Sequence, residues 1–466
     1  MINIKTDSRK VKPGDTFVAI KGFTVDGHDY IEQAIKNGAT KIICEKGSYS
    51  VDTEIVPNSK KWLQEYIVNN YKDELNDIKL IGVTGTNGKT TTCYLVYQML
   101  KELGAKVAYM GTIGFYFEDK MKQLPNTTPE ILDVYSLIID AKEKGATHFV
   151  MEVSSHALSE KRVEGLMFSA EAFTNLTEDH LDFHKTMDNY LQAKLLILNQ
   201  LKENGKIIVN NDVPYAKEFE QKNYETLGFS GNDYKILNYK DTSNGTKITF
   251  SVNDKEYEVE TNLKTKFNVY NYLTCVAIVK NMGYEMKDIL SVTPSIYPPK
   301  GRCEAVKVGD AQAVIDYAHT PDAVEKIIDA FNEDKKGKII TLVGCGGDRD
   351  PLKRPIMGSI ASNKSDYVIF TNDNPRTEDP EKIMKDILKG VDNKNYEVIL
   401  DRKQAINRGL SMLKKDDVLL ILGKGHEDYQ IIGHEKRHFS DLEEVENYNR
   451  TQNFTRVRKW IMLKLL

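Results

Sequence analysis

Cysteine is scarce in this sequence, and the features of a disulfide-built or zinc-knuckle protein are missing. Five cysteines occur in 466 residues, an odd number, and no two of them have the Cys-x-x-Cys spacing typical of structural zinc sites. A disulfide framework and a zinc centre are therefore both disfavoured. We expect the thiols to be reduced and mostly buried.

Long apolar runs and a strong charge of one sign are also missing. No segment is apolar over the length needed to cross a bilayer, and the first residues, MINIKTDSRKVK, lack the apolar stretch of a signal peptide. The 64 basic and 68 acidic residues give a net charge of −4, which offers no electrostatic footprint for nucleic acid. These absences predict a cytoplasmic protein with small-molecule substrates, no nucleic-acid partner and no stable membrane insertion.

The sequence contains enough apolar residues to form several hydrophobic cores. Hydrophobic residues make up 40% of the 466 residues, and a single core stops growing at roughly 250–300 residues. Strand and helix patterns alternate and divide into three predicted domains, residues 1–78, 79–300 and 301–466. The expected fold class is α/β, with a parallel sheet in the central domain and a doubly wound, Rossmann-like sheet in the last.

Two details of the central pattern are specific enough to test. Residues 230–262 are typical of β-hairpins, with turns at Asn244-Gly245 and Asn253-Asp254. A helix is predicted from Asp188 to the Asn204-Gly205 pair, and the strand KIIVN follows it.

The segment GVTGTNGKTTT, residues 82–92, predicts a strand, a phosphate-binding loop and the start of a helix. Val83 stands where the strict P-loop pattern has its first glycine. Backbone N–H groups of the loop can face phosphate oxygens, Lys89 can neutralise their charge, and Thr90 can ligate magnesium. The alternative is an ordinary strand–turn–helix whose glycines serve backbone geometry only.

Four further segments carry candidate side chains. Glu152 ends an apolar strand, where it is either a magnesium ligand beside the loop or a solvated carboxylate. Residues 175–184 hold three acids and two histidines, which suits either metal binding or a hydrogen-bonded loop. Lys194 shares a predicted helical face with leucines, which favours a side chain that extends to solvent. Asn268 and Asn271 open a helix, either to contact a ligand base or as caps.

Polar clusters also follow three strands of the last domain. They are Cys345–Asp350, Asn372–Arg376 and Gly423–Glu427. Ligands of open α/β sheets bind outside the carboxyl ends of the strands, so the three clusters are predicted to meet on one rim.

Taken together, these segments resemble the Mur ligase family over nearly the whole chain. The motifs are Asp7-Ser8-Arg9, Asp26-Gly27-His28, GTNGKTT, NTTP at 126–129, MEVSSHAL, TNLTEDHLDFH, FNVYN, GRCE, DYAHTPD, GCGGDRD, DNPR and GKGHEDYQ. The resemblance implies an N-terminal domain for a UDP-sugar, a central ATPase and a C-terminal domain for an amino acid. It implies ATP as co-substrate, Mg²⁺ as cofactor and a monomer.

The resemblance also implies roles for residues. Lys89, Glu152, His180 and Lys194 would be catalytic, and the magnesium ligands would be Thr90, Glu152, His180 and a carbamylated Lys194. ATP contacts would be Gly85, Thr86, Asn87, Gly88, Lys89, Thr90, Thr91, Asn268, Asn271, Arg302 and Asp316. Contacts to the UDP-MurNAc-peptide would be Thr6, Ser8, Phe23, Thr24, Val25, Asn126, Thr127, Thr128, Ser154, Glu160 and Arg162.

The nearest branch of the family adds the third residue of the peptidoglycan peptide to UDP-MurNAc-L-Ala-D-Glu through an acyl phosphate. Amino-acid contacts by resemblance are Arg349, Asp373, Asn374, Pro375, Arg376, Gly423 and Glu427. An arginine at 376 goes with meso-diaminopimelate, whose distal carboxylate it can hold with paired hydrogen bonds. The alternatives are L-lysine as the added residue, and Arg376 as a mere surface ion pair.

Two other functions are the alternatives to this one. A folylpolyglutamate-synthetase-like ligase shares the ATPase but does not need the N-terminal motifs, and a non-catalytic nucleotide-binding module would not need Lys89, Glu152, His180 or Lys194. Residues 454–466, FTRVRKWIMLKLL, do not match the family's usual ending; they are interpreted as a tail rather than a membrane-contacting amphipathic helix.

Overall fold

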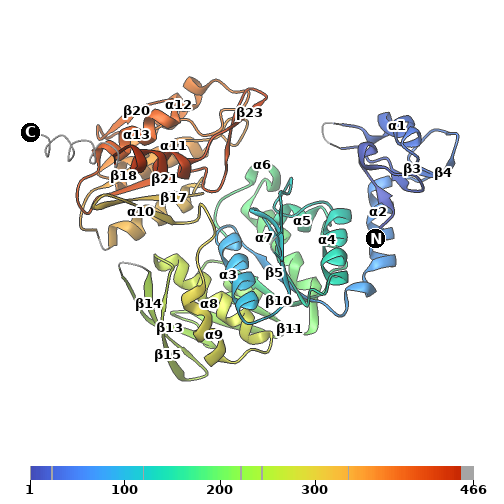
Figure 1. Cartoon of the computed structure of the whole chain (residues 1–466), viewed down its shortest axis with the longest axis horizontal. Helices are drawn as coiled ribbons and strands as arrows, with labels where there is room; N and C mark the ends of the chain where they lie inside the picture. The colour runs from blue at the N-terminus through green and yellow to red at the C-terminus, as the bar shows by residue number, and fades with distance from the viewer. Residues whose placement is uncertain are drawn as a thin grey trace, which may run out of the picture.

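The computed structural model describes residues 2–22, 25–118, 120–220, 223–242, 245–333 and 335–452. Phe23, Thr24, Asn244 and the tail 454–466 lie outside the described residues. The chain forms three main sheets in sequence order, which Figure 1 shows as three neighbouring bodies with the first sheet at one end.

The first sheet is small and entirely parallel. Its order is β1-β2-β3-β4, and the helix that follows it connects it to the rest of the chain (Figure 1). The elements are β1 (Ile4–Lys5), β2 (Thr16–Val18), α1 (Ile31–Lys36), β3 (Lys41–Cys44), β4 (Asp52–Ile55) and α2 (Ser59–Tyr71).

The central sheet has eleven strands in the order β15-β14-β13-β12-β11-β10-β5-β9-β6-β7-β8. Its parallel centre is β5 (Lys79–Thr84), β6 (Val107–Gly111), β9 (His148–Glu152), β10 (Phe168–Phe173), β11 (Leu201–Asn210) and β12 (Tyr224–Gly228). The edges are β7 (Gly114–Phe117) and β8 (Lys120–Lys122) on one side, and β13 (Tyr234–Asp241), β14 (Thr246–Val252) and β15 (Lys255–Thr261) on the other.

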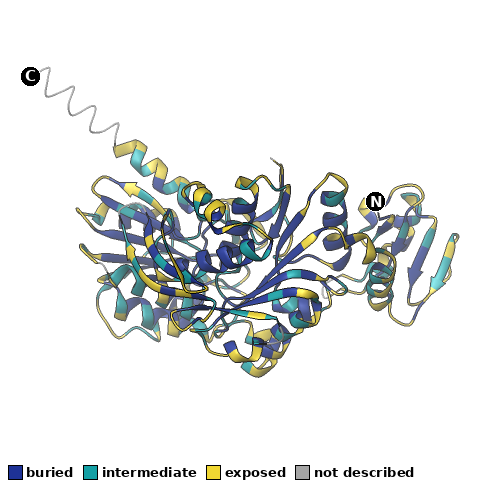
Figure 2. Ribbon diagram, turned by 90° about the horizontal axis from the view of Figure 1, so that it is seen from below, coloured by how far each residue is buried: buried dark blue, intermediate teal, exposed yellow. Residues whose placement is uncertain are grey.

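Helices cover both faces of this sheet. One core contains α3 (Lys89–Glu102), α8 (Lys266–Asn281) and α9 (Met286–Val292), and the other contains α4 (Ile131–Glu143), α5 (Ser155–Ser159) and α7 (Met187–Leu195). The short α6 (Leu181–His184) lies just before α7. Because both faces are covered, the central strands are buried along their length (Figure 2). This explains why they appear in the sequence as continuous apolar runs.

The third sheet has the order β16-β17-β21-β18-β19-β20, parallel except for β16. Its strands are β16 (Glu304–Val308), β17 (Ala311–Asp316), β18 (Ile339–Val343), β19 (Tyr367–Phe370), β20 (Tyr396–Val398) and β21 (Val418–Leu422). Its helices are α10 (Pro321–Glu333), α11 (Lys353–Lys364), α12 (Pro380–Leu388) and α13 (Arg402–Met412). A separate hairpin, β22 (Tyr429–Ile432) and β23 (Glu435–His438), follows β21.

One predicted turn is confirmed and one predicted helix is wrong in its extent. Asn253 and Asp254 join β14 to β15 with φ of 50° and 63°, the left-handed pair that a two-residue hairpin needs. The helix predicted from 188 to 204 begins at Met187 after its Thr186 cap and ends at Leu195. A 3₁₀ turn and β11 follow, because Leu201 pairs with Phe168 in the parallel ladder.

The five cysteines are free and buried, as the sequence predicts. None of the described helices is both long and apolar enough to cross a membrane.

A buried ion pair joins the strand ends of the third sheet. The Arg402 guanidinium donates to both carboxylate oxygens of Asp441 at 2.8 and 2.7 Å, and neither side chain is exposed. It also donates to the carbonyls of Leu422 (3.0 Å) and Asn372 (3.3 Å). Arg402 therefore fixes the ends of β21 and β19 relative to each other.

Replacing Arg402 should loosen this sheet strongly. In Arg402→Met the Asp441 carboxylate stays buried without its partner, which typically costs about 3–5 kcal/mol. Amide hydrogen exchange in β19 and β21 should report that loss. The control is Arg408→Met on the same helix, which breaks the exposed Arg408–Glu397 pair (2.9 Å) and should cost less than about 1 kcal/mol. Equal exchange in the two variants would contradict this account.

Candidate active site

The phosphate loop lies between β5 and α3, and its glycines are required by contacts. Gly85 has φ of 145°, and a Cβ atom there would lie 1.9 Å from Thr174 Oγ1. Gly88 has φ of 88°, and its Cβ would lie 2.6 Å from Asn271 Oδ1. Both positions therefore exclude a side chain, which lets neighbouring segments approach the loop closely. The Thr86 and Asn87 amides of the loop donate to Asn175 at 2.8 and 2.9 Å.

Two lysines donate to the same backbone carbonyl of the loop. Lys89 Nζ donates to the carbonyls of Gly85 (2.9 Å) and Thr86 (2.8 Å), and Lys194 Nζ donates to the Gly85 carbonyl at 2.7 Å. Lys194 is 1% exposed, so the expectation that it extends to solvent is wrong. Burial, and then the nearby Lys89 cation, hold the pKa of Lys194 well below its ordinary range.

Glu152 ends β9 as a fully buried carboxylate. Tyr109 Oη and the Thr112 amide both donate to its Oε1 at 2.8 Å. Thr90 Oγ1 (2.9 Å) and Thr112 Oγ1 (3.1 Å) donate to Oε2. The alternative of a solvated carboxylate is therefore wrong, because protein donors take the place of water. The Glu152 carbonyl also accepts from Thr128 Oγ1 (2.8 Å).

The nucleotide side of the site is a cavity of about 730 Å³, lined by residues 86–91 and by Glu152, Asn271, Arg302 and Asp316. Arg302 donates to Thr90 Oγ1 (3.1 Å) and lies over the Tyr317 ring, 4.5 Å from its centroid. Asp316 accepts from the amides of Cys303 and Ala318 at 2.7 Å, and burial raises its pKa.

The two asparagines of α8 are both buried, but only one lines the cavity. Asn271 Nδ2 donates to Asn268 Oδ1 (3.0 Å), and Asn268 Nδ2 donates to the Lys264 carbonyl (2.9 Å). Neither caps α8, whose N-cap position is Thr265. Asn268 thus holds Asn271 against Gly88.

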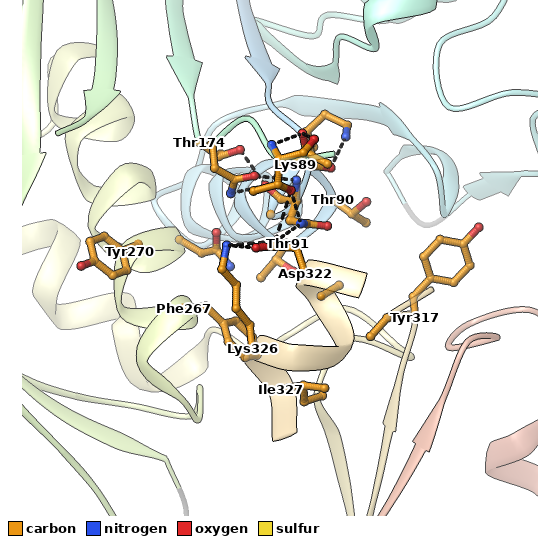
Figure 3. Close-up of a pocket in the computed structure, with 18 of the residues that line it drawn as sticks. Lys89, Thr90, Thr91, Thr174, Phe267, Tyr270, Tyr317, Asp322, Lys326 and Ile327 are labelled. Carbon is orange, nitrogen blue, oxygen red and sulfur yellow. Dashed lines mark hydrogen bonds and ion pairs between the residues drawn. The ribbon is translucent and has the colours of Figure 1, made fainter. Parts of the chain in front are cut away.

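Sequence reasoning missed Asp322, which joins the loop to the third sheet. Asn87 Nδ2 (2.9 Å), Thr177 Oγ1 (3.2 Å) and Lys326 Nζ (2.9 Å) all donate to Asp322 Oδ2. Figure 3 shows Asp322 and Lys326 on α10 facing the start of α3, with Phe267 and Tyr270 beside them. The DYAHTPD motif contains this aspartate, yet only the fold brings it to Asn87.

His180 lies where the nucleotide cavity joins a second one. Its φ is 55°, and its Nε2 lies 3.4 Å from Asp179 Oδ2. The His180 side chain is 44% exposed, and desolvation by the protein around it lowers its pKa below the ordinary value of 6.5. Among the described residues no three His, Cys, Asp or Glu side chains group closely enough to hold a metal. The predicted ligand set contains only two such residues, Glu152 and His180.

The second cavity has a volume of about 970 Å³ and combines the predicted peptide and amino-acid contacts. Its lining includes Asn126, Thr127, Thr128, Ser154, Arg162, Arg349, Asp373, Asn374, Arg376, Gly423 and Glu427. The polar clusters after β18, β19 and β21 thus meet on one rim, as predicted. Both cavities share Thr112, Thr127, Ser154, Asp179, His180, Tyr317 and His319.

Arg376 is half-buried with a left-handed backbone, φ 52°. Its Nη1 donates to the Gly347 carbonyl (2.7 Å), and its own amide and carbonyl bond to Ile431 and Gly433 of the β22–β23 hairpin. Glu378 of the same segment pairs with Arg354 instead (2.6 Å). The hairpin therefore holds Arg376 at the cavity, and the surface-ion-pair alternative is disfavoured.

The neighbouring residues of the rim form one connected network. Asn374 Nδ2 (2.9 Å) and Lys424 Nζ (3.0 Å) donate to Glu427 Oε2. Asp373 is buried and caps the Asn374 amide (2.6 Å). Pro375 and Glu160, both predicted contacts, do not line the described cavities; Glu160 instead accepts from Arg162 Nη2 (2.9 Å).

Three predicted uridine contacts, Thr6, Ser8 and Val25, are described; they lie in the segments around the first sheet and line neither cavity. Thr6 and Val25 are exposed, and Ser8 is buried. The Ser8 carbonyl accepts from Asn37 Nδ2 (2.8 Å).

A loop of the phosphate-binding type at one cavity, joined to a second cavity, fits a nucleotide-using α/β ligase. Family models agree: the Mur ligase family catalytic domain matches residues 2–76, the Mur ligase middle domain 83–279 and the glutamate ligase domain 301–425. The chain belongs to the Mur ligase family, whose members are ATP-dependent ligases.

Individual relatives support the same assignment. A protein of Clostridium acetobutylicum named UDP-N-acetylmuramoyl-L-alanyl-D-glutamate–2,6-diaminopimelate ligase 1 is 41% identical over 456 residues, 96% of this chain and 94% of the relative. A solved structure of a ligase of that name is 30% identical, with a TM-score of 0.66 over 97% of this chain and 95% of the other. MurF from Thermotoga maritima in complex with ADP shares the fold, with a TM-score of 0.70 at 21% identity over 97% and 98% of the chains.

We predict that the pKa of His180 lies below 6.5, because the protein around the ring desolvates it. We predict that the pKa of the exposed His438 lies above 6.5, because Glu443 bonds to its ring. The unfolded chain binds the His180 proton more readily, so the stability from this ring is complete above pH 6.5 and is lost as pH falls toward the lowered pKa. NMR titration of histidine-labelled protein, assigned with His180→Asn, checks both directions. A midpoint for His180 at or above 6.5 would contradict the burial argument.

Proposed function

We propose that this chain adds meso-diaminopimelate to the γ-carboxylate of D-Glu in UDP-MurNAc-L-Ala-D-Glu, with ATP, during peptidoglycan precursor synthesis. The observation that carries the proposal is the junction of the two cavities at Thr127, Ser154 and His180, beside Glu152 and the phosphate loop. A phosphate at the loop and a carboxylate in the second cavity would meet there.

The donors at the junction suit magnesium. Thr90 Oγ1 and Glu152 Oε2 are oxygen ligands 2.9 Å apart, and hard cations prefer oxygen. We propose that Thr90, Glu152, His180 and a carbamylated Lys194 hold Mg²⁺, which when bound neutralises charge on the phosphates. The neutral Lys194 amine favours carbamylation, in which nitrogen adds to carbon dioxide and loses a proton, giving an anionic oxygen donor.

The chain's own residues account for the remaining chemistry. Lys89 can leave the Gly85 and Thr86 carbonyls for the transferring phosphoryl group, and Arg302 faces the same region through Thr90. The substrate carboxylate attacks the γ-phosphorus and forms an acyl phosphate as ADP leaves. The amine then attacks the acyl carbon through a tetrahedral intermediate, and phosphate departs as the amide forms.

Arg376 and Glu427 would set the choice of amino acid. The Arg376 guanidinium suits a distal carboxylate, and Glu427 suits a distal ammonium. L-Lysine has the ammonium but lacks that carboxylate, so Arg376 favours meso-diaminopimelate.

The rest of the proposal concerns the whole chain. We propose domains 1–78, 79–300 and 301–466 for the UDP-substrate, ATP and amino acid, with Thr6, Ser8 and Val25 on the UDP side and Asn126, Thr128 and Arg162 on the peptide side. A monomer acting in the cytoplasm is proposed with it. A folylpolyglutamate-synthetase-like ligase is disfavoured, because the family match extends over residues 2–76.

Phosphate release should be fastest with meso-diaminopimelate. The assay supplies UDP-MurNAc-L-Ala-D-Glu, ATP and magnesium, and offers meso-diaminopimelate, L-lysine and L-ornithine separately. A preference for L-lysine would refute the role of Arg376, and no release with any amino acid would refute the ligase proposal.

Arg376→Ala should lower kcat/KM for meso-diaminopimelate by about 10–100-fold, because hydrogen bonds between charged groups contribute about 1.5–3 kcal/mol. The KM for ATP should stay unchanged. Arg437→Ala is the control, since Arg437 lies on the adjacent hairpin, is 58% exposed and pairs only with Glu435 among the interactions described. A loss of ATP binding in Arg376→Ala would show that the pocket is wrongly assigned.

A further inference from the structure

Tyr109 is a buried tyrosine that the reaction chemistry leaves without a role. It lies on β6 with no exposed surface, and its hydroxyl donates to Glu152 Oε1 at 2.8 Å. It does not line either cavity. Within the described part of the chain, its hydroxyl reaches the nucleotide site through the Glu152 carboxylate.

The two oxygens of that carboxylate both accept from Thr112, Oε2 from its hydroxyl at 3.1 Å, and they differ in their other partner. Oε1 is occupied by Tyr109 and by the Thr112 amide, both at 2.8 Å. Oε2 accepts from Thr90 Oγ1 (2.9 Å), which lines the nucleotide cavity. The donors on Oε1 thus set the rotation of the carboxylate and direct Oε2 to the cavity.

The tyrosine is itself firmly held. Its ring packs against those of Tyr94, Tyr97 and Tyr116, at centroid distances of 5.9, 6.1 and 5.7 Å. Gly111 leaves room for the contact, since a Cβ there would lie 2.4 Å from the Tyr109 hydroxyl and 2.2 Å from Glu152 Oε1. The hydroxyl therefore has one fixed position, against the carboxylate.

We propose that Tyr109 is a positioning residue, which orients the Glu152 carboxylate so that Oε2 is presented as a ligand for the nucleotide-bound metal ion. The inference rests on the proposed role of Glu152 in holding magnesium. Partners that orient a metal ligand commonly change metal affinity by about 10–100-fold when removed. Tyr109→Phe keeps the ring packing and deletes only the donor.

The test measures Mn²⁺ binding, as a probe for Mg²⁺, by electron paramagnetic resonance of the full chain with a non-hydrolysable ATP analogue. Tyr109→Phe should raise the Kd for Mn²⁺ by about 10–100-fold. The matched control is Tyr116→Phe in the same aromatic cluster, which should bind Mn²⁺ as the wild type does. Thermal unfolding of the metal-free proteins runs in parallel.

A lower melting temperature of Tyr109→Phe with unchanged Mn²⁺ affinity would overturn the inference and leave Tyr109 a structural residue. Glu152→Gln separates this failure from that of the proposed function. If Glu152→Gln binds Mn²⁺ normally, the metal role of Glu152 is wrong; if only Glu152→Gln loses affinity, the positioning role of Tyr109 is wrong.

Discussion

The centre of this enzyme depends on one buried carboxylate. A buried glutamate side chain without water must be surrounded by hydrogen-bond donors. Glu152 has donors on both sides of the site: Tyr109 and Thr112 at the end of β6, and Thr90 at the start of α3. Its carbonyl fixes Thr128 at the peptide cavity as well. The phosphate loop, the oxygens proposed to bind metal and the segment proposed to bind the peptide are thereby held in one arrangement.

Two lysine side chains of the site donate to the same backbone oxygen of the loop. Lys89 and Lys194 share the Gly85 carbonyl, and each is desolvated, so the arrangement favours a neutral Lys194 and a Lys89 that exchanges backbone carbonyls for phosphate oxygens. Asp322 on α10 reaches the same loop through Asn87. The loop is therefore connected by hydrogen bonds both to the central sheet and to α10 beside the third sheet.

The sequence predicts the parts of this site that follow from strand ends and glycines. The GTNGKTT loop and the clusters after β18, β19 and β21 lie where parallel strands must deliver them. It does not predict Asp322, which is 235 residues from its partner Asn87, or Tyr109, which looks like any apolar strand residue. The helix ends at Leu195 and not at residue 204, because Leu201 pairs with β10. Pairing with a distant strand therefore outweighs the local helix propensity.

The central claim is that the γ-phosphate passes to a carboxylate and not to water. It is tested most directly with UDP-MurNAc-L-Ala-D-Glu carrying ¹⁸O in the γ-carboxylate, followed by mass spectrometry of the phosphate released in the presence of ATP and meso-diaminopimelate. An acyl phosphate transfers one carboxylate oxygen to phosphorus, so each phosphate released should contain one ¹⁸O atom. Phosphate without the label, formed while the amide product accumulates, would contradict the account.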